Sequence, residues 1–188
     1  MYGDIINFIF VVFTSIVYAM IEIELEAKEG WMKNIPTANI IWFGNKYMTL
    51  YHIYMIILMF FTFVFQNQMI FTLASILYTL SNMILFLFLE DTLWFILNPY
   101  FTIDKYTKKD IWWHASQPWI LGIPLHNYII SIVMVLIWLI TGNNYVIINL
   151  LLSYVVLLLS IPLSKYYHKF YLYYHQDDIK KNKNKNIN

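Results

Sequence analysis

The sequence predicts an all-α polytopic membrane bundle of about five transmembrane helices, with the amino terminus outside and the carboxyl terminus in the cytoplasm. Composition is the first support: 60% of the residues are hydrophobic and only 12% are charged, whereas a soluble domain carries roughly 25% charged residues. The second is the position of the basic residues. All 12 are lysines, and none of them falls inside a long apolar stretch.

Five apolar stretches approach or exceed the roughly 20 residues needed to cross a bilayer. They cover residues 5–21, 48–65, 69–89, 119–141 and 145–163. The stretches are continuously apolar rather than alternating, so we expect helices and not the short strands of a barrel. Because they occupy most of the chain, we expect one domain over residues 1–175, followed by a disordered polar and basic tail over 176–188.

The lysines also predict the orientation of these helices. They lie after the first, third and fifth stretches, whereas the short connections Gln66–Gln68 and Gly142–Asn144 carry no charge. Short loops rich in lysine stay in the cytoplasm, and connections this short join antiparallel helices. We therefore expect a multi-pass protein of the plasma membrane, in contact with membrane lipids and without a nucleic-acid partner.

An acidic pair, Glu90 and Asp91, stands at the inner end of the third stretch, and apolar sequence resumes after it. A carboxylate at membrane depth is costly unless it is paired, so such residues are candidates for function. On a helix, Asp91 and Asn98 share one face, while Glu90 and Trp94 share a neighbouring face. The alternative is a solvated helix end beneath a belt of aromatic residues.

Two histidines, His52 and His114, approach the membrane level of Glu90 if the predicted topology holds. Together with the carboxylates they suit acid/base chemistry, or ligation of a hard or borderline metal. Ordinary interfacial histidines are the alternative. No pair has a fixed metal spacing such as His-x-x-x-His, so we assign no metal ligand and the cofactor stays unknown. The candidate catalytic residues are Glu90, Asp91, His114 and His52.

Three further residues complete the candidate site. Among the alternating glutamates of residues 22–26, we expect Glu24 to face the bundle, with a solvated acidic rim as the alternative. Trp31 either covers a site or anchors the chain at the headgroups. His126 lies in the apolar run that opens the fourth stretch, where an ionisable group is a functional candidate or a neutral, hydrogen-bonded histidine. The candidate substrate-binding residues are Asn98, Trp94, Trp31, Glu24 and His126.

Two segments resemble the lycopene cyclase-type small membrane proteins of carotenoid synthesis. That family carries a Pro-x-Glu-Glu pattern followed by an aromatic pair. Here Glu90-Asp91 precedes Trp94-Phe95, with Phe88 at the position of the proline. Gly122-Ile-Pro-Leu resembles the approach to a second copy, in which His126-Asn127 replaces the acidic pair. The resemblance implies protonation of an isoprenoid double bond, with Glu90 or Asp91 as the acid.

Several chemistries are excluded by what the sequence lacks. There is no cysteine, so disulfides, thiolate ligands and cysteine nucleophiles are absent. A glycine-rich phosphate loop and a Gly-x-Ser-x-Gly motif are also missing, which disfavours nucleotide hydrolysis and serine hydrolase chemistry.

Two functions remain open. The first is a membrane-embedded enzyme that carries out acid/base chemistry, of the isomerase or cyclase kind, on a lipid or isoprenoid at the cytoplasmic leaflet. The second is a non-enzymatic membrane subunit or small carrier whose buried polar residues are structural. Polar groups in membranes pair across helices or between chains, so the second function fits a homo-oligomer or a complex with a partner subunit.

Overall fold

A computed structural model describes residues 2–26, 28, 30–31, 36–43, 46–101 and 103–176. Within these ranges the chain forms five α-helices, which confirms the all-α prediction. They are α1 (Tyr2–Glu26), α2 (Leu50–Gln66), α3 (Leu73–Leu97), α4 (Leu125–Thr141) and α5 (Asn144–Tyr174). The smaller elements are the hairpin of β1 (Asn39–Phe43) with β2 (Lys46–Thr49), the hairpin of β3 (Trp119–Ile120) with β4 (Ile123–Pro124), and the 3-10 turns η1 (Ile103–Lys105) and η2 (Trp112–His114).

Three of the helices are long and apolar enough to cross a membrane, by length and composition. These segments are Ile5–Glu26, Leu73–Leu97 and Asn144–Tyr174. The helices α2 and α4 have 17 residues each, which at 1.5 Å per residue gives about 25 Å. These properties suggest a membrane protein.

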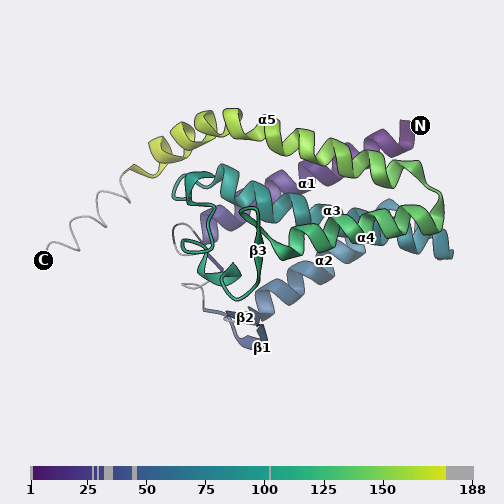
Figure 1. Ribbon diagram of the computed structural model, residues 1–188, viewed down its shortest axis with the longest axis horizontal. Helices are drawn as coiled ribbons and strands as arrows, with labels where there is room; N and C mark the ends of the chain where they lie inside the picture. Colours follow the sequence, from purple (N-terminus) through teal and green to yellow (C-terminus); the bar gives the residue numbers. More distant parts are fainter. Residues whose placement is uncertain are drawn as a thin grey trace, which may run out of the picture.

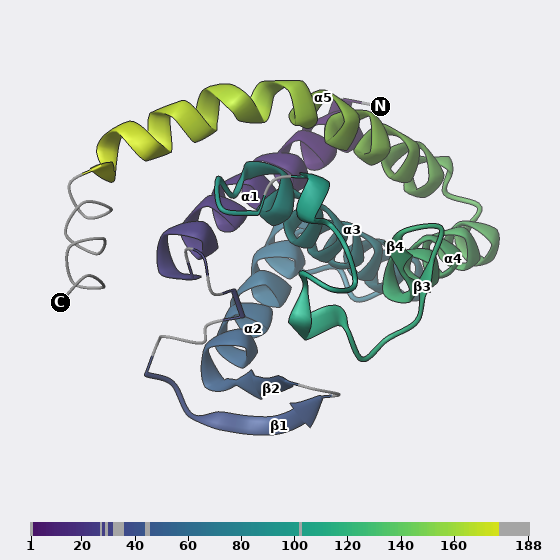
Figure 2. The same cartoon turned by 60° about the vertical axis from the view of Figure 1, so that its left-hand side comes forward.

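Helix α3 is the centre of the bundle. It packs against α1, α2, α4 and α5, and the ribbon views show these helices arranged around it (Figures 1 and 2). Its side chains Leu85, Leu89 and Leu93 are fully buried. The outer helices instead expose large apolar side chains such as Phe13 and Leu158. A helix that is apolar on every side belongs in the middle of a bundle, and exposed apolar faces of this kind suit contact with lipid.

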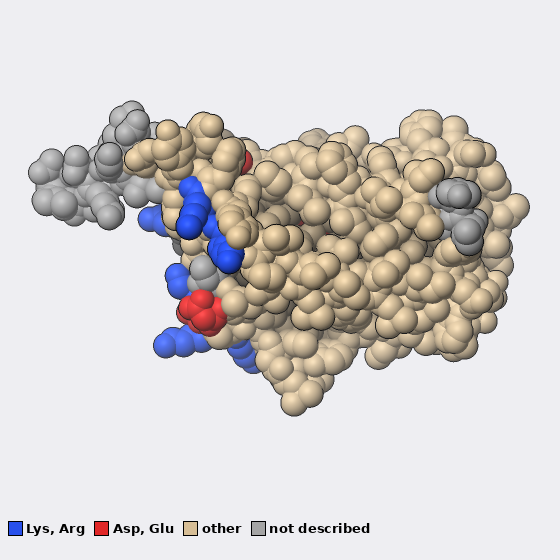
Figure 3. All heavy atoms as spheres, turned by 90° about the horizontal axis from the view of Figure 1, so that it is seen from above, with Lys and Arg blue, Asp and Glu red and all other residues tan. Residues whose placement is uncertain are grey.

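Charged side chains gather at one end of the bundle. This end, which we call the charged end, comprises the hairpin β1–β2, residues 98–124 and the last turns of α5. Figure 3 shows the lysine and acidic side chains of the visible face at this end, with other residue types along the rest of the body. Helix α1 begins at the opposite end (Figure 1). The turns at that opposite end, residues 67–72 and 142–143, contain no charged residue.

The fourth apolar stretch does not form a helix over its whole predicted length. Residues 119–124 form the hairpin β3–β4, and α4 begins only at Leu125. The two central turn residues, Leu121 and Gly122, have φ values of 50° and 78°, as in a type I′ turn. The backbone N–H of Leu125 donates to the Pro118 carbonyl at 3.0 Å. An apolar hairpin and an apolar helix have the same composition, so hydropathy did not separate them.

The other helix boundaries also differ from the predicted spans. Helix α3 continues past the acidic pair to Leu97, where the side chain of Asn98 accepts a hydrogen bond from the Tyr100 backbone N–H at 2.9 Å. Pro99 follows, and the residue before a proline disfavours the helical conformation. Helix α5 continues well beyond residue 163, and the hairpin β1–β2 was not predicted. The tail predicted to be disordered, 176–188, lies outside the described residues apart from Gln176.

Candidate functional site

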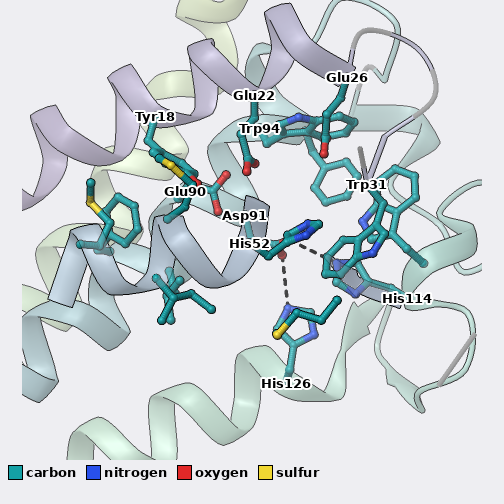
Figure 4. Close-up of a pocket in the computed structure, with 18 of the residues that line it drawn as sticks. Tyr18, Glu22, Glu26, Trp31, His52, Glu90, Asp91, Trp94, His114 and His126 are labelled. Carbon is teal, nitrogen blue, oxygen red and sulfur yellow. Dashed lines mark hydrogen bonds and ion pairs between the residues drawn. The ribbon is translucent and has the colours of Figure 1, made fainter. Parts of the chain in front are cut away.

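A cavity of about 380 Å³ lies among α1, α2, α3 and α4 at the charged end of the bundle (Figure 4). Trp31 and the turn η2 supply further parts of its wall. Its acidic lining residues are Glu22, Glu26, Glu90 and Asp91, and its basic ones are Lys46, His52, His114 and His126. The rest of the lining is mainly apolar and includes Met55, Ile56, Met59, Phe86, Leu87 and Ile130. The lining of the cavity therefore combines charged and apolar side chains.

Helix α1 presents Tyr18, Glu22 and Glu26 to this cavity. Their spacing of four residues places them on one face of the helix. Glu24 lies on another face, where its side chain keeps 49% of its exposure and pairs with His175 at 3.1 Å. The expectation that Glu24 faces the bundle is therefore wrong. Alternation shows that Glu24 differs from its neighbours, but only packing against α3 decides which face is turned inward.

Two carboxyl groups meet on the α1 side of the cavity. Glu22 interacts with Glu90 and with the hydroxyl group of Tyr18, and Figure 4 shows the two carboxyl groups pointing toward one another. Carboxyl groups so close together avoid repulsion only if one of them carries a proton, which it then donates to the other. The pair therefore shares one proton in a buried position.

Glu90 also leaves one polar atom without a partner. The residue is 9% exposed, and its Oε1 atom has no hydrogen-bond partner among the residues that the structure describes. The same holds within those residues for Nε1 of Trp94, which lines the cavity beside it. Buried polar groups are almost always hydrogen-bonded, so these atoms are suited to meet a bound molecule.

Asp91 belongs to a different group on the α3–α4 side. His114 donates from Nε2 to Oδ1 of Asp91 at 3.2 Å, and His126 donates from Nε2 to Oδ2 at 3.3 Å. The two imidazole rings are tilted by 34° relative to one another, with centroids 4.7 Å apart. Figure 4 shows both histidines directed at the carboxylate, His114 from η2 and His126 from the first turn of α4. The structure thus brings His114 together with one carboxylate of the acidic pair, Asp91.

Gln117 closes this group into a ring. Its amide Nε2 donates to Nδ1 of His114 at 2.9 Å, and its Oε1 accepts from Nδ1 of His126 at 3.0 Å. The backbone N–H of His126 donates to the same oxygen at 3.2 Å, which defines the oxygen end of the amide. Both ring nitrogens of His126 are therefore engaged, Nδ1 with Gln117 and Nε2 with Asp91.

Aromatic packing holds His114 in place. The neighbouring Trp113 ring stacks on Phe95 at 5.8 Å and meets Trp94 edge-on at 5.5 Å. Gly30, with a φ of +66°, contacts the outer edge of the same ring so closely that an added Cβ atom would lie 2.5 Å from it. The indole of Trp119 donates to the His114 carbonyl at 3.1 Å. Burial of His114 lowers the pKa of its imidazole, although Asp91 acts in the opposite direction.

Lys46, Trp31 and His52 form a stack at the mouth of the cavity. The ammonium of Lys46 lies 3.3 Å from the centroid of the Trp31 ring, which stacks on His52 at 4.4 Å. Nε1 of Trp31 donates to the Tyr47 carbonyl at 2.7 Å. Burial lowers the pKa of Lys46 to about 8, and the negative charges of Asp91 and Glu26 limit this decrease. The ammonium of Lys46 is thereby held over the face of Trp31, where a cation–π interaction stabilises it.

The structure brings most of the predicted site residues together. Lining the cavity are Glu90, Asp91, His114, His52, Trp94, Trp31 and His126. Asn98 does not line it, because its side chain caps the end of α3, and Glu24 points away. The residues that sequence reasoning missed are Tyr18, Glu22, Glu26, Lys46 and Gln117. For Glu22 and Glu26, the spacing of four after Tyr18 was the available signal; Gln117 and Lys46 had none.

The geometry supports two kinds of chemistry. The Glu22–Glu90 pair and the ring around Asp91 can donate and accept protons within one cavity. In addition, one ligand atom from each of Asp91, His114 and His126 lies within 4.8 Å of the others, close enough to hold a metal ion.

Comparison of the chain with family models, with curated proteins and with solved structures finds no match. The functional assignment therefore rests on the side chains of the cavity.

Proposed function

We propose that this protein is a membrane-embedded enzyme that carries out acid/base chemistry, of the isomerase or cyclase kind, on a lipid or isoprenoid at the cytoplasmic leaflet. The observation that carries the proposal is a buried carboxyl oxygen, Oε1 of Glu90, which has no hydrogen-bond partner among the described residues and belongs to a residue that lines the cavity. A carboxyl group in such a place is expensive to bury and is suited to exchange a proton with a bound substrate.

The shape of the cavity favours an amphiphilic substrate. Its volume of about 380 Å³ falls in the usual range of ligand sites, roughly 300–1,000 Å³. Methionine and aliphatic side chains such as Met55, Met59 and Ile130 line it together with the charged groups. An apolar chain would lie along these aliphatic side chains, with its reacting end beside Glu90.

The Glu22–Glu90 pair can supply and take back the one proton that an isomerisation needs. The Glu22–Glu90 pair would transfer its proton to a carbon–carbon double bond, forming a C–H bond and leaving a carbocation on the neighbouring carbon. The faces of Trp94 and Trp113 would stabilise that cation. Loss of a proton from an adjacent carbon to the carboxylate of the pair would then form a new double bond and restore the enzyme. Product and substrate have the same mass, as the resemblance to the cyclase-type family also implies.

The membrane setting is part of the proposal. We infer that all five helices span the plasma membrane, with the amino terminus outside and the charged end in the cytoplasm. The support is the gathering of the charged side chains at one end (Figure 3) and the positive-inside rule. A reporter fused after Asn188 should face the cytoplasm, and one inserted at Asn67 should face outside. The opposite result at either position would reverse the orientation.

The test of the enzyme proposal compares lipid extracts of cells that express the wild-type protein or single variants. The variants Glu90→Gln and Asp91→Asn remove an ionisable carboxyl group and keep its shape, and Glu24→Gln is the matched control outside the cavity. We expect the wild type and the control to produce a lipid of unchanged mass with a new chromatographic retention time. Glu90→Gln should lose it, with a decrease of more than about 100-fold for loss of a general acid. Asp91→Asn should also lose it, because Asp91 holds His114 and His126 in the same cavity.

Correct folding of each variant is checked by its elution from a size-exclusion column in detergent. If the lipid profiles of wild type and both cavity variants are the same, the protein is not an enzyme of this kind. Loss of a partner chain from the complex in the Glu90→Gln variant, with no change in lipids, would instead identify a membrane subunit whose polar residues are structural.

A further inference from the structure

We infer that Asp91, His114 and His126 form a binding site for a divalent first-row transition-metal ion of borderline character, such as Zn²⁺. The three side chains come from α3, from η2 and from the first turn of α4. The inference rests on their geometry and does not depend on the proposed isomerase or cyclase activity.

The distances between the donor atoms fit such an ion. Nε2 of His114 and Nε2 of His126 lie 3.2 and 3.3 Å from the two oxygens of Asp91. In a tetrahedral site with bonds of about 2.0–2.1 Å, neighbouring ligand atoms are about 3.3–3.4 Å apart. All three donors lie within 4.8 Å of one another. A small rotation of the imidazole rings would therefore complete the coordination geometry.

The types of donor define the class of metal. Two imidazole nitrogens and one carboxylate oxygen are the protein ligands of several catalytic zinc sites and of non-haem iron sites. Calcium and magnesium prefer sites made of oxygen alone, so they fit this set poorly. With no cysteine in the chain, no thiolate competes for the ion.

The exposure of the donors points to a site that is open on one side. The side chain of His114 is 7% exposed, whereas those of Asp91 and His126 are 27% and 29% exposed. All three line the same cavity. A metal held by three protein ligands beside a cavity keeps positions for a substrate or water, which distinguishes catalytic from structural zinc sites.

Gln117 contacts both histidine ligands from outside the site, and its amide leads to a prediction for metal affinity. A metal ion at this site would bind Nε2 of each histidine. Each neutral imidazole would then carry its proton on Nδ1 and donate it to an acceptor. The amide oxygen of Gln117 serves His126 at 3.0 Å, but its NH₂ group faces Nδ1 of His114 at 2.9 Å. A carboxylate at this position would accept from both histidines. The change Gln117→Glu should therefore tighten metal binding by about 10-fold or more.

The experiment uses the full-length protein in detergent, purified with a tag free of histidine and treated with a chelator. Zn²⁺ and Co²⁺ are then titrated separately, with metal analysis for stoichiometry and visible absorption for the cobalt coordination. We expect one equivalent of metal per chain. His114→Ala and His126→Ala should each weaken binding by more than about 100-fold, because loss of even an outer contact costs about 10–100-fold.

Two further histidine variants serve as controls. His52→Ala alters the cavity outside the three donors, and His175→Ala alters the surface pair with Glu24. Both should keep the wild-type affinity within about twofold. If His114→Ala or His126→Ala fails to fold, the comparison of Gln117→Glu with wild type still decides the question. Absence of stoichiometric metal in the wild type, or an equal loss in all four histidine variants, would overturn the inference without affecting the lipid test.

Discussion

The contact between Gly30 and Trp113 predicts a large loss of stability on adding a single methyl group. Gly30 has a φ of +66°, and a Cβ atom there would lie 2.5 and 2.6 Å from two ring carbons of Trp113. The ring cannot easily give way, since it is 4% exposed and packs on Phe95 and Trp94. For Gly30→Ala, the left-handed backbone costs about 1–2 kcal/mol and the overlap about 1–3 kcal/mol. We therefore expect a loss of about 2–5 kcal/mol.

Gly142 provides the matched control. Its φ is +63°, but an added Cβ atom would meet no atom of the described residues within 4 Å. Gly142→Ala should therefore cost only the backbone part, about 1–2 kcal/mol. Both free energies of unfolding can be measured by reversible denaturation in mixed micelles, followed by tryptophan fluorescence. If the two variants lose the same stability, the Trp113 ring has room to move and does not hold η2 in place as argued above.

The remaining predictions concern the charged residues around the cavity. Lys46 has a pKa of about 8, below its ordinary 10.5. The unfolded chain thus binds more protons between these values, so stability should rise by up to about 3 kcal/mol from pH 8 to 10.5. The difference between wild type and Lys46→Met isolates this effect from the tyrosines, and a pH-independent difference would contradict it. The titratable groups that face Lys46 are Asp91, Glu26, His52 and His114. Glu24→Gln should change stability by less than about 1 kcal/mol, because its pair with His175 is partly exposed. A larger loss, measured by the same denaturation, would show that the pair is structural.

The interpretation of the site from sequence selected residues that share one cavity where a residue type alone carries a cost in a membrane. Glu90, Asp91 and His126 were selected because ionisable groups next to apolar runs are expensive in a membrane, and all three line the cavity. It failed where the direction of a side chain decides. Glu24 and Glu22 have the same chemistry and lie two positions apart, yet only Glu22 meets Glu90. Rotation about the axis of α1 is set by its packing on α3, which no local pattern encodes.

Loop residues were the hardest to assign. Gln117 is one of many polar residues in its segment. It can bridge the two histidines only because the hairpin β3–β4 brings His126 back beside His114. Hydropathy predicts a helix over residues 119–124, where the structure has the hairpin. A contact between residues 91 and 126 joins two segments far apart in the chain, so it exists only after α3 and α4 have packed together.

By itself, the sequence determined that the chain is helical, where its five apolar helices lie approximately, and that its charged groups gather at one end. These properties follow from hydropathy and charge, which each residue contributes independently of its neighbours in space. Tertiary structure alone decided that Glu22 meets Glu90, that Gln117 bridges two histidines on Asp91, and that a cavity lies between the two groups. Those features depend on which faces of α1, α3 and α4 turn toward one another, and the packing of the whole bundle sets those rotations.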